Sequence, residues 1–286
     1  MTPPAYSELR IHGWQANVFG PVSLLLELED LFPARERPPL DGLQPHSSTF
    51  EVALDSPQSG WQQIMCDGEP VWTGHDTGEL LAHLEWAINR TAAEWLGQRY
   101  LLFHAGAVAC EGRGLILPAP SGGGKTTLVA GLVAAGFEYL SDEVAMIEPS
   151  DLSLLPFAKS LCVKAGGREV LMPLYPALAE VIPRRRFGGE PVWYLPLRGE
   201  IRSSTPVRAR YVVLPSYQPE ATTALRPLRR SAALQRLLEQ SFNLRVHGAW
   251  AVGRLAEMLR QTECYALSVG SLQSAVDVLG ELARDS

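Results

Sequence analysis

The sequence contains little cysteine, little lysine and no long apolar run, and these shortages exclude several classes of protein. No Cys-x-x-Cys pair occurs and no histidines cluster near a cysteine, so we expect neither structural zinc nor a disulfide framework. No stretch approaches the ~18 uninterrupted apolar residues of a membrane span, and residues 1–6 lack the basic-then-apolar pattern of a signal peptide. We therefore expect a cytoplasmic protein with no membrane span.

Because lysine is scarce, arginine carries nearly all of the positive charge, and it is unevenly spread. Residues 1–150 hold 7 Lys and Arg against 19 Asp and Glu, whereas residues 151–286 hold 18 against 12. A basic half could suit nucleic acid, but the longest basic run is Arg184–Arg186 and no aromatic residues are interleaved with basic ones. We expect no nucleic-acid partner. Most arginines should be solvated, and a few should meet anionic groups.

The sequence has enough apolar residues for a sizeable folded protein. Its 286 residues are 46% hydrophobic with a net charge of -6, which is too hydrophobic and too weakly charged for a disordered chain. At roughly 100–200 residues per domain, this length allows about two domains. The sequence pattern changes after residue 76, which places the boundary between the two domains there.

Residues 1–76 have the pattern of a small β-rich module, in which short apolar runs alternate with Pro, Gly, Asp and Ser. These runs predict three strands, over 22–28, 49–54 and 61–66. Asp67-Gly68 is typical of a hairpin turn, and the prolines of 30–46 predict an irregular loop. Over 77–98 the apolar residues recur at helical spacing, which predicts a helix that links the module to the rest of a second domain, 77–286.

The second domain has the element order of an α/β protein. Its central part predicts strands over 100–110 and 114–118, a glycine-rich loop, a helix over 128–135 and a strand over 137–147. Its C-terminal part predicts strands over 211–215 and 265–269 and helices over 231–242, 249–261 and 272–283. Strand–loop–helix–strand is the βαβ arrangement of an α/β core.

The glycine-rich loop has the pattern of a phosphate-binding loop (P-loop), Ala119-x-x-x-x-Gly124-Lys125-Thr126, with Ala in place of the usual first Gly. Successive glycines let backbone N–H groups face one phosphate chain at a helix N-terminus. Lys125 can then reach the β- and γ-phosphates, and the Thr126 hydroxyl can ligate Mg²⁺. We expect a nucleoside triphosphate here. The residues expected to contact it are Pro120, Ser121, Gly122, Gly123, Gly124, Lys125, Thr126 and Thr127.

Two adjacent carboxylates, Asp142 and Glu143, follow the loop at the end of an apolar segment. One carboxylate could hold Mg²⁺, directly or through water, and the other could accept a proton from an attacking hydroxyl or water. Side chains alternate along a strand, so both roles require a strand end or a turn at this point.

His104, the turn Gly112–Gly114, the loop 120–126 and the pair Asp142-Glu143 together resemble the catalytic core of HPr kinase/phosphorylase. The resemblance covers roughly residues 100–148. It implies the fold shared with phosphoenolpyruvate carboxykinase, which is a P-loop α/β core with a strongly bent mixed sheet, preceded by a separate N-terminal domain. Proteins of this family often form oligomers, so a homo-oligomer is one expectation.

The resemblance also implies a role for each matched residue in an ATP- and Mg²⁺-dependent serine kinase. Lys125 would contact the phosphates, and Thr126 and Glu143 would be the magnesium ligands. Asp142 would be the base for the acceptor seryl hydroxyl, and His104 would lie near the transferred phosphoryl group.

The chain departs from the family pattern at three places. Glu143 replaces the second Asp of the pair. The family's downstream magnesium-binding glutamate has no counterpart, and the corresponding stretch, 156–164, offers Lys159 and Lys164 instead. The glycine-rich loop associated with phosphorylase activity is not recognisable, so we expect kinase activity alone.

Three functions remain open from the sequence. The first is phosphoryl transfer from ATP to a serine of a protein or peptide, with the basic C-terminal half meeting an acidic substrate or the phosphate chain. The second is a small-molecule kinase whose carboxylate substrate is held by arginines. The third is a non-catalytic module that binds nucleotide and gates a partner. The carboxylate pair favours the enzymes, and the resemblance favours a protein or peptide acceptor.

Overall fold

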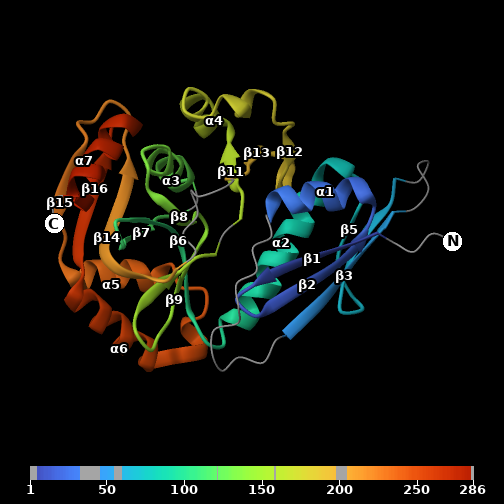
Figure 1. Ribbon diagram of the computed structural model, residues 1–286, viewed down its shortest axis with the longest axis horizontal. Coiled ribbons are helices and arrows are strands. Elements are labelled where there is room, and N and C mark those ends of the chain that lie inside the picture. The colour runs from blue at the N-terminus through green and yellow to red at the C-terminus, as the bar shows by residue number, and fades with distance from the viewer. Residues whose placement is uncertain are drawn as a thin grey trace. The chain divides into compact units, whose positions relative to one another are not determined.

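The computed structural model describes residues 5–32, 46–54, 60–120, 122–157, 159–197 and 205–284, and it shows a mixed α/β protein (Figure 1). The chain forms two compact units. The first consists of Met1–Leu96 and Glu180–Pro196, and the second of Gly97–Ala179 and Leu197–Ser286. The unit boundary after Leu96 differs from the domain boundary expected after residue 76, because the long helix over 77–96 packs with the N-terminal strands. Among the described helices, none is long and apolar enough to cross a membrane.

The first unit contains a five-stranded sheet in the order β1-β2-β3-β4-β5, with every pair antiparallel except β2 and β3. The strands are β1 (Ala5–Ile11), β2 (Trp14–Gly20), β3 (His46–Leu54), β4 (Gln62–Cys66) and β5 (Glu69–Gly74). Two helices, α1 (Val22–Leu31) and α2 (Thr77–Leu96), pack on it and on each other. The β-rich pattern and the Asp67-Gly68 hairpin are confirmed, since both turn residues have positive φ.

One expected strand of this unit is wrong, because residues 22–28 belong to helix α1. Leu24, Leu25, Leu28 and Leu31 are buried, and their spacing is helical. A short apolar run does not distinguish a strand from a buried helix, and here Leu26 turns outward to 60% exposure. The loop expected over 30–46 lies mostly outside the described residues.

The segment that returns to the first unit carries the basic run Arg184–Arg186. Strand β12 (Arg184–Arg185) pairs with β13 (Pro191–Leu195), and a 3₁₀ turn (Phe187–Gly189) joins them. Arg184 pairs with Glu27, Arg185 with Asp76 and Arg186 with Glu85. These three arginines were expected to contact an acidic substrate or the phosphate chain. In the structure they instead pair with carboxylates of their own unit.

The second unit contains an eight-stranded mixed sheet in the order β10-β9-β6-β7-β14-β16-β15, with β8 also paired to β6. The strands are β6 (Leu101–Cys110), β7 (Arg113–Pro118), β8 (Glu138–Ser141), β9 (Val144–Ile147), β10 (Ser153–Leu155), β14 (Val207–Tyr217), β15 (Ala224–Pro227) and β16 (Glu263–Val269). Strand β10 pairs with both β9 and β14, so the sheet curls back on itself. Strands β7, β14 and β16 run parallel, and their carboxyl ends therefore share one edge.

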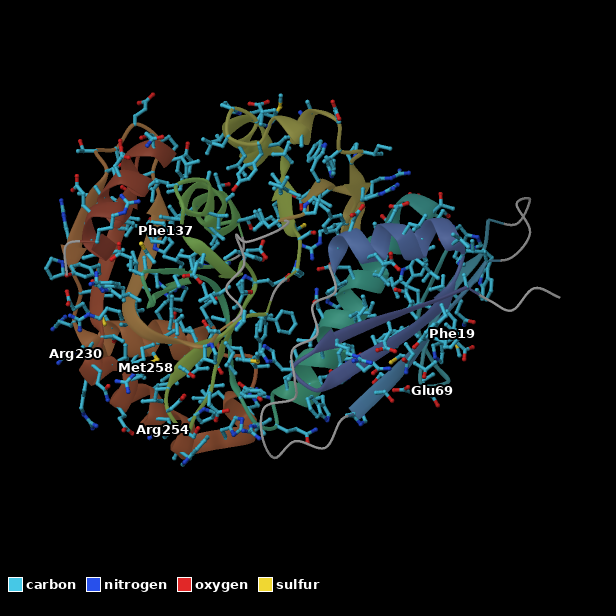
Figure 2. The ribbon with its side chains drawn as sticks, viewed as in Figure 1. Phe19, Glu69, Phe137, Arg230, Arg254 and Met258 are labelled. Carbon is cyan, nitrogen blue, oxygen red and sulfur yellow. The ribbon has the colours of Figure 1, made fainter. Side chains whose placement is uncertain are left out.

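Helices and short segments complete the second unit: α3 (Lys125–Ala134), β11 (Leu161–Lys164), α4 (Ala165–Leu171), a 3₁₀ turn (Pro176–Ala179), α5 (Arg230–Glu239), α6 (Leu244–Gln261) and α7 (Leu272–Arg284). Helices α3 and α7 lie side by side, while α5 and α6 close the apolar core of the sheet. Figure 2 labels Met258 and Arg254 on α6. Met258 belongs to this core, whereas Arg254 donates to the carbonyls of Pro149 and Ser150. The elements expected over 100–147 and 211–283 are present, with ends that differ by several residues in β14 and α6.

Candidate functional site

The glycine-rich loop joins β7 to α3, and its backbone depends on glycine. Gly122 and Gly124 both have φ of 80°, a left-handed conformation that glycine adopts without steric cost. The Gly123 N–H donates to the Pro120 carbonyl at 3.1 Å, which closes the loop into a turn. Ser121 lies outside the described residues. Residues 122–124 therefore form a tight turn whose backbone carries no side chains.

The loop delivers the chain into the N-terminus of α3, where backbone N–H groups accumulate. The first helical bond runs from the Leu128 N–H to the Gly124 carbonyl, so the N–H groups before it have no partner within the helix. Gly124 is the N-cap, and no described side chain caps this end. The first turn contains no acidic residue that would repel an anion. Partial positive charge at this end favours a phosphate group.

Lys125 is buried beside the loop, with 6% of its surface exposed. Its Nζ donates to the Ala119 carbonyl at 2.7 Å and to the Pro120 carbonyl at 3.4 Å. Burial lowers the pKa of Lys125 to about 8, although the charges of Asp142 and Glu143 act in the opposite direction. The side chain is thus held over the loop by carbonyl groups that a phosphate chain could replace.

Asp142 and Glu143 occupy a bend between β8 and β9, which supplies the interruption that their expected roles require. Both strands pair with β6. The Ser141 hydroxyl oxygen accepts hydrogen bonds from the N–H groups of Glu143 and Val144, at 3.3 and 3.0 Å, and so fixes the bend. As a result the two carboxylates point to different partners.

The carboxylate of Asp142 faces the first turn of α3, directly after the glycine-rich loop. The side chain is 4% exposed, and the Thr126 hydroxyl donates to its Oδ2 at 3.4 Å. The Tyr139 hydroxyl lies 3.3 Å from its Oδ1 and also donates to the Lys159 carbonyl at 3.0 Å. Asp142 is therefore held between the first turn of α3 and the segment that precedes β11.

Glu143 pairs with Lys159, whose Nζ lies 2.8 Å from its Oε2. Lys159 is almost fully buried, whereas the Glu143 side chain is 31% exposed. The expected magnesium ligands were Thr126 and Glu143, but the structure brings Thr126 to Asp142 and Glu143 to Lys159. The carboxylate of Glu143 is thus engaged by a buried lysine and not by the first turn of α3.

His104 lies on β6 close to the acidic bend. Its Cα partner is Val144, the residue after Glu143, and its neighbour Ala105 pairs with Pro118, where the loop begins. Alternation along β6 places His104 on the same face as Gly106, which contacts Val129 of α3. Its ring lies 5.9 Å from that of Phe242. The strand register therefore brings His104 to the side of the sheet that carries the loop.

Thr127 and Tyr139 also lie near the glycine-rich loop and the acidic bend. Thr127, expected to contact nucleotide, lies against α4, because a Cβ on Gly167 would come within 2.7 Å of its hydroxyl oxygen. Tyr139 was not found from the sequence. Its position three residues before Asp142 in an apolar segment indicated only core packing.

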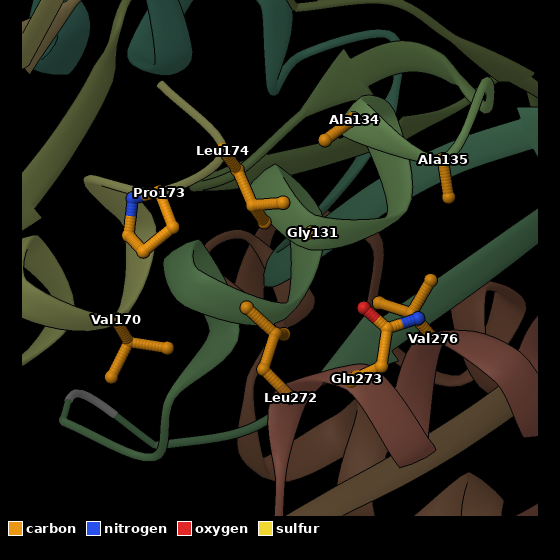
Figure 3. Close-up of a pocket in the computed structure, with 9 residues that line it drawn as sticks. All are labelled: Gly131, Ala134, Ala135, Val170, Pro173, Leu174, Leu272, Gln273 and Val276. Carbon is orange, nitrogen blue, oxygen red and sulfur yellow. The ribbon is translucent and has the colours of Figure 1, made fainter. Parts of the chain in front are cut away.

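An apolar hollow of this unit lies elsewhere on α3 (Figure 3). Its volume is about 480 Å³, and its lining consists of Gly131, Ala134, Ala135, Val170, Pro173, Leu174, Leu272, Gln273 and Val276. Gly131, Ala134 and Ala135 belong to the C-terminal half and end of α3, whereas the loop precedes its N-terminus. The hollow is therefore separate from the glycine-rich loop.

No family model matches the chain, and no curated protein matches it at a significant level.

Proposed function

We propose that this chain is an ATP-dependent serine kinase with a P-loop core of the HPr kinase type. The observation that carries the proposal is the buried carboxylate of Asp142, held 3.4 Å from the Thr126 hydroxyl at the first turn after a glycine-rich loop. This arrangement joins a phosphate-binding backbone to a carboxylate that reaches the end of the phosphate chain. A loop that only bound phosphate would not require a buried carboxylate there.

The loop and Lys125 bind and orient the phosphate chain. The N–H groups at the start of α3 face the phosphates, and the Lys125 ammonium moves from the Ala119 carbonyl to the β- and γ-phosphates. Phosphoryl transfer depends mainly on positioning and on neutralising charge in the transition state. Fixed N–H groups and one buried cation supply both.

The Thr126 hydroxyl in the first turn of α3 is a hard oxygen donor, which suits Mg²⁺. Within the described ranges, no three His, Cys, Asp or Glu side chains gather as a metal site. Magnesium bound with nucleotide phosphates commonly uses only one or two protein groups. Thr126 would hold the ion directly, and the ion would neutralise charge between the β- and γ-phosphates.

Asp142 is the base in this proposal. The acceptor hydroxyl oxygen forms a bond to the γ-phosphorus, the bond from that phosphorus to the β–γ bridging oxygen breaks, and ADP leaves. The proton of the acceptor hydroxyl passes to the Asp142 carboxylate. Glu143 is bound to Lys159 and balances that buried charge, while His104 lies beside the bend, where it can contact the transferred group.

A protein or peptide acceptor follows from the resemblance to HPr kinase, and an acceptor screen tests it. The purified chain is incubated with γ-labelled ATP, Mg²⁺ and either macromolecular or metabolite fractions, and Lys125→Ala is the control. We expect label on a serine of a macromolecule, and none with the variant. Label on metabolites alone would indicate a small-molecule kinase. Tight ATP binding without transfer would indicate a nucleotide-gated module.

A further inference from the structure

The carboxyl end of β14 carries an exposed tyrosine beside the phosphate loop. Strand β14 pairs in parallel with β7, with Val212 opposite Ile116, so the same register places Leu214 level with Pro118 at the end of β7. Strand β14 then continues to Tyr217, three residues further in the direction in which the loop leaves the sheet. In open α/β sheets, ligands bind outside the carboxyl ends of parallel strands.

Tyr217 is a near neighbour of the loop itself. A Cβ on Gly124 would lie 3.9 Å from the Cβ of Tyr217, which is ordinary van der Waals contact. Gly124 directly precedes Lys125, so Tyr217 flanks the part of the loop that faces the phosphate chain. Tyr217 is 59% exposed, whereas the centre of its strand is buried.

The backbone beyond Tyr217 is firmly held, so the ring stands on a rigid support. The Gln218 N–H donates to the Val269 carbonyl at 3.0 Å, and the Thr223 hydroxyl oxygen accepts from the N–H of Gly270 at 3.1 Å. The turn that contains Ala221 packs directly against Gly270, because a Cβ on Gly270 would overlap the Ala221 carbonyl oxygen. Little ordering is therefore required when a ligand contacts this position.

We propose that Tyr217 is the stacking platform for the nucleoside base of the bound triphosphate, an inference that rests on the proposed phosphate site. A planar base lying on an exposed, rigidly supported aromatic ring gains affinity without specific hydrogen bonds. The loop recognises the phosphates, and Tyr217 distinguishes a nucleotide from a bare phosphate chain. Because every base presents a π-face, stacking alone also predicts similar affinities for ATP and GTP.

The test compares ATP with inorganic tripolyphosphate, which has no base. Binding of both ligands is measured by calorimetry for wild type, Tyr217→Ala and Tyr217→Phe. Tyr6→Ala is the control, because Tyr6 is 50% exposed on β1 of the other unit. We expect Tyr217→Ala to weaken ATP about tenfold and to leave tripolyphosphate unchanged. Tyr217→Phe and Tyr6→Ala should behave like wild type.

Other outcomes show whether the proposal for Tyr217 fails alone or together with the proposed phosphate site. If Tyr217→Ala weakens both ligands equally, the ring supports the loop and the proposal is wrong. If it weakens neither, no base lies on Tyr217. A wild-type protein that binds tripolyphosphate as tightly as ATP overturns the platform but leaves the phosphate site standing. One that binds neither ligand overturns both.

Discussion

At the scale of single residues, the buried ammonium of Lys125 is the feature with the clearest consequence. Without ligand its pKa is about 8, because burial disfavours the charged form. Phosphate groups beside it favour the charged form and raise that pKa. Above pH 8 the bound protein therefore carries more protons than the free protein, so affinity falls as pH rises.

This predicts proton uptake on nucleotide binding at pH 9 and none at pH 7. Calorimetry in two buffers of different ionisation enthalpy measures the uptake directly, and affinity should fall by up to about tenfold per pH unit above 8. Lys125→Met should bind weakly and without this pH dependence. Equal affinity at pH 7 and 9 in the wild type would contradict the placement of Lys125 at the phosphates.

Gly124 supplies a second prediction at this scale. Its φ of 80° costs a residue with a Cβ about 1–2 kcal/mol, although space for the Cβ is available. We expect Gly124→Ala to lower stability by about that amount and nucleotide affinity by about tenfold or more. Gly112→Ala is the matched control, because Gly112 has φ of 75° in a turn with open space around it. It should lose similar stability and no affinity.

The sequence predicted most of the single residues that the structure brings together, because the P-loop pattern is local. Loop, lysine and hydroxyl follow one another along the chain, so their proximity needs no tertiary information. The ion pair between Glu143 and Lys159 could not be predicted in this way. Its partners belong to separate segments, and only the path of the chain from β9 back to β11 makes them neighbours.

At the scale of elements, the contact between β6 and α3 holds the loop in place. A Cβ on Gly106 would lie 2.6 Å from a methyl group of Val129, so the strand and the helix approach through a glycine. We expect Gly106→Ala to lower the free energy of unfolding by about 1–3 kcal/mol through overpacking. Denaturant unfolding measures this cost.

A double mutant isolates the contact. Val129→Ala removes the methyl groups that Gly106→Ala would strike, so the pair should cost less than the sum of the single changes. Gly253→Ala on α6 is the control. Open space surrounds Gly253, and alanine favours a helix by up to about 1 kcal/mol. Additive costs for Gly106→Ala and Val129→Ala would show that the two residues do not meet.

Element type was predictable where hydrophobic periodicity was sustained, as in α2 and α7, and failed where it was short. Residues 22–28 were expected to form a strand and form part of α1, because a short apolar run does not distinguish a strand from a buried helix. The bend at Asp142 was inferred from the two roles expected of the carboxylates, and the hydrophobic pattern of 137–147 alone does not show it. Its cause, the Ser141 hydroxyl, acts through two backbone N–H groups.

At the scale of the whole molecule, the chain leaves the first unit after Leu96 and returns to it over 180–196. The hydrophobic pattern cannot predict such a return, because it depends on contacts between segments that are distant in the sequence, including ion pairs. Glu85 is almost fully buried on α2, and its partner across 3.5 Å is Arg186. Arg185 and Asp76 form a second pair that is largely exposed.

Arg186→Met should therefore destabilise the first unit by about 2–4 kcal/mol, because it leaves a buried carboxylate without its cation. Arg185→Met should change stability by less than about 1 kcal/mol, since exposed pairs contribute little. Hydrogen exchange locates the effect. Exchange should accelerate in α2 and not in α3, and equal acceleration in both helices would contradict the two-unit description.

The central claim is that the Asp142 carboxylate is the base for phosphoryl transfer. The site binds ATP through the loop and Lys125 and does not need the charge of Asp142 for binding. The most direct measurement is ATP turnover with Mg²⁺, made beside nucleotide binding, for wild type, Asp142→Asn and the matched control Glu143→Gln. We predict that Asp142→Asn loses turnover by about 100-fold or more while binding ATP within a few-fold of wild type. Glu143→Gln should keep most of the turnover. Unchanged turnover in Asp142→Asn, with ATP still bound through Lys125, would contradict the kinase assignment and favour a nucleotide-gated binding module.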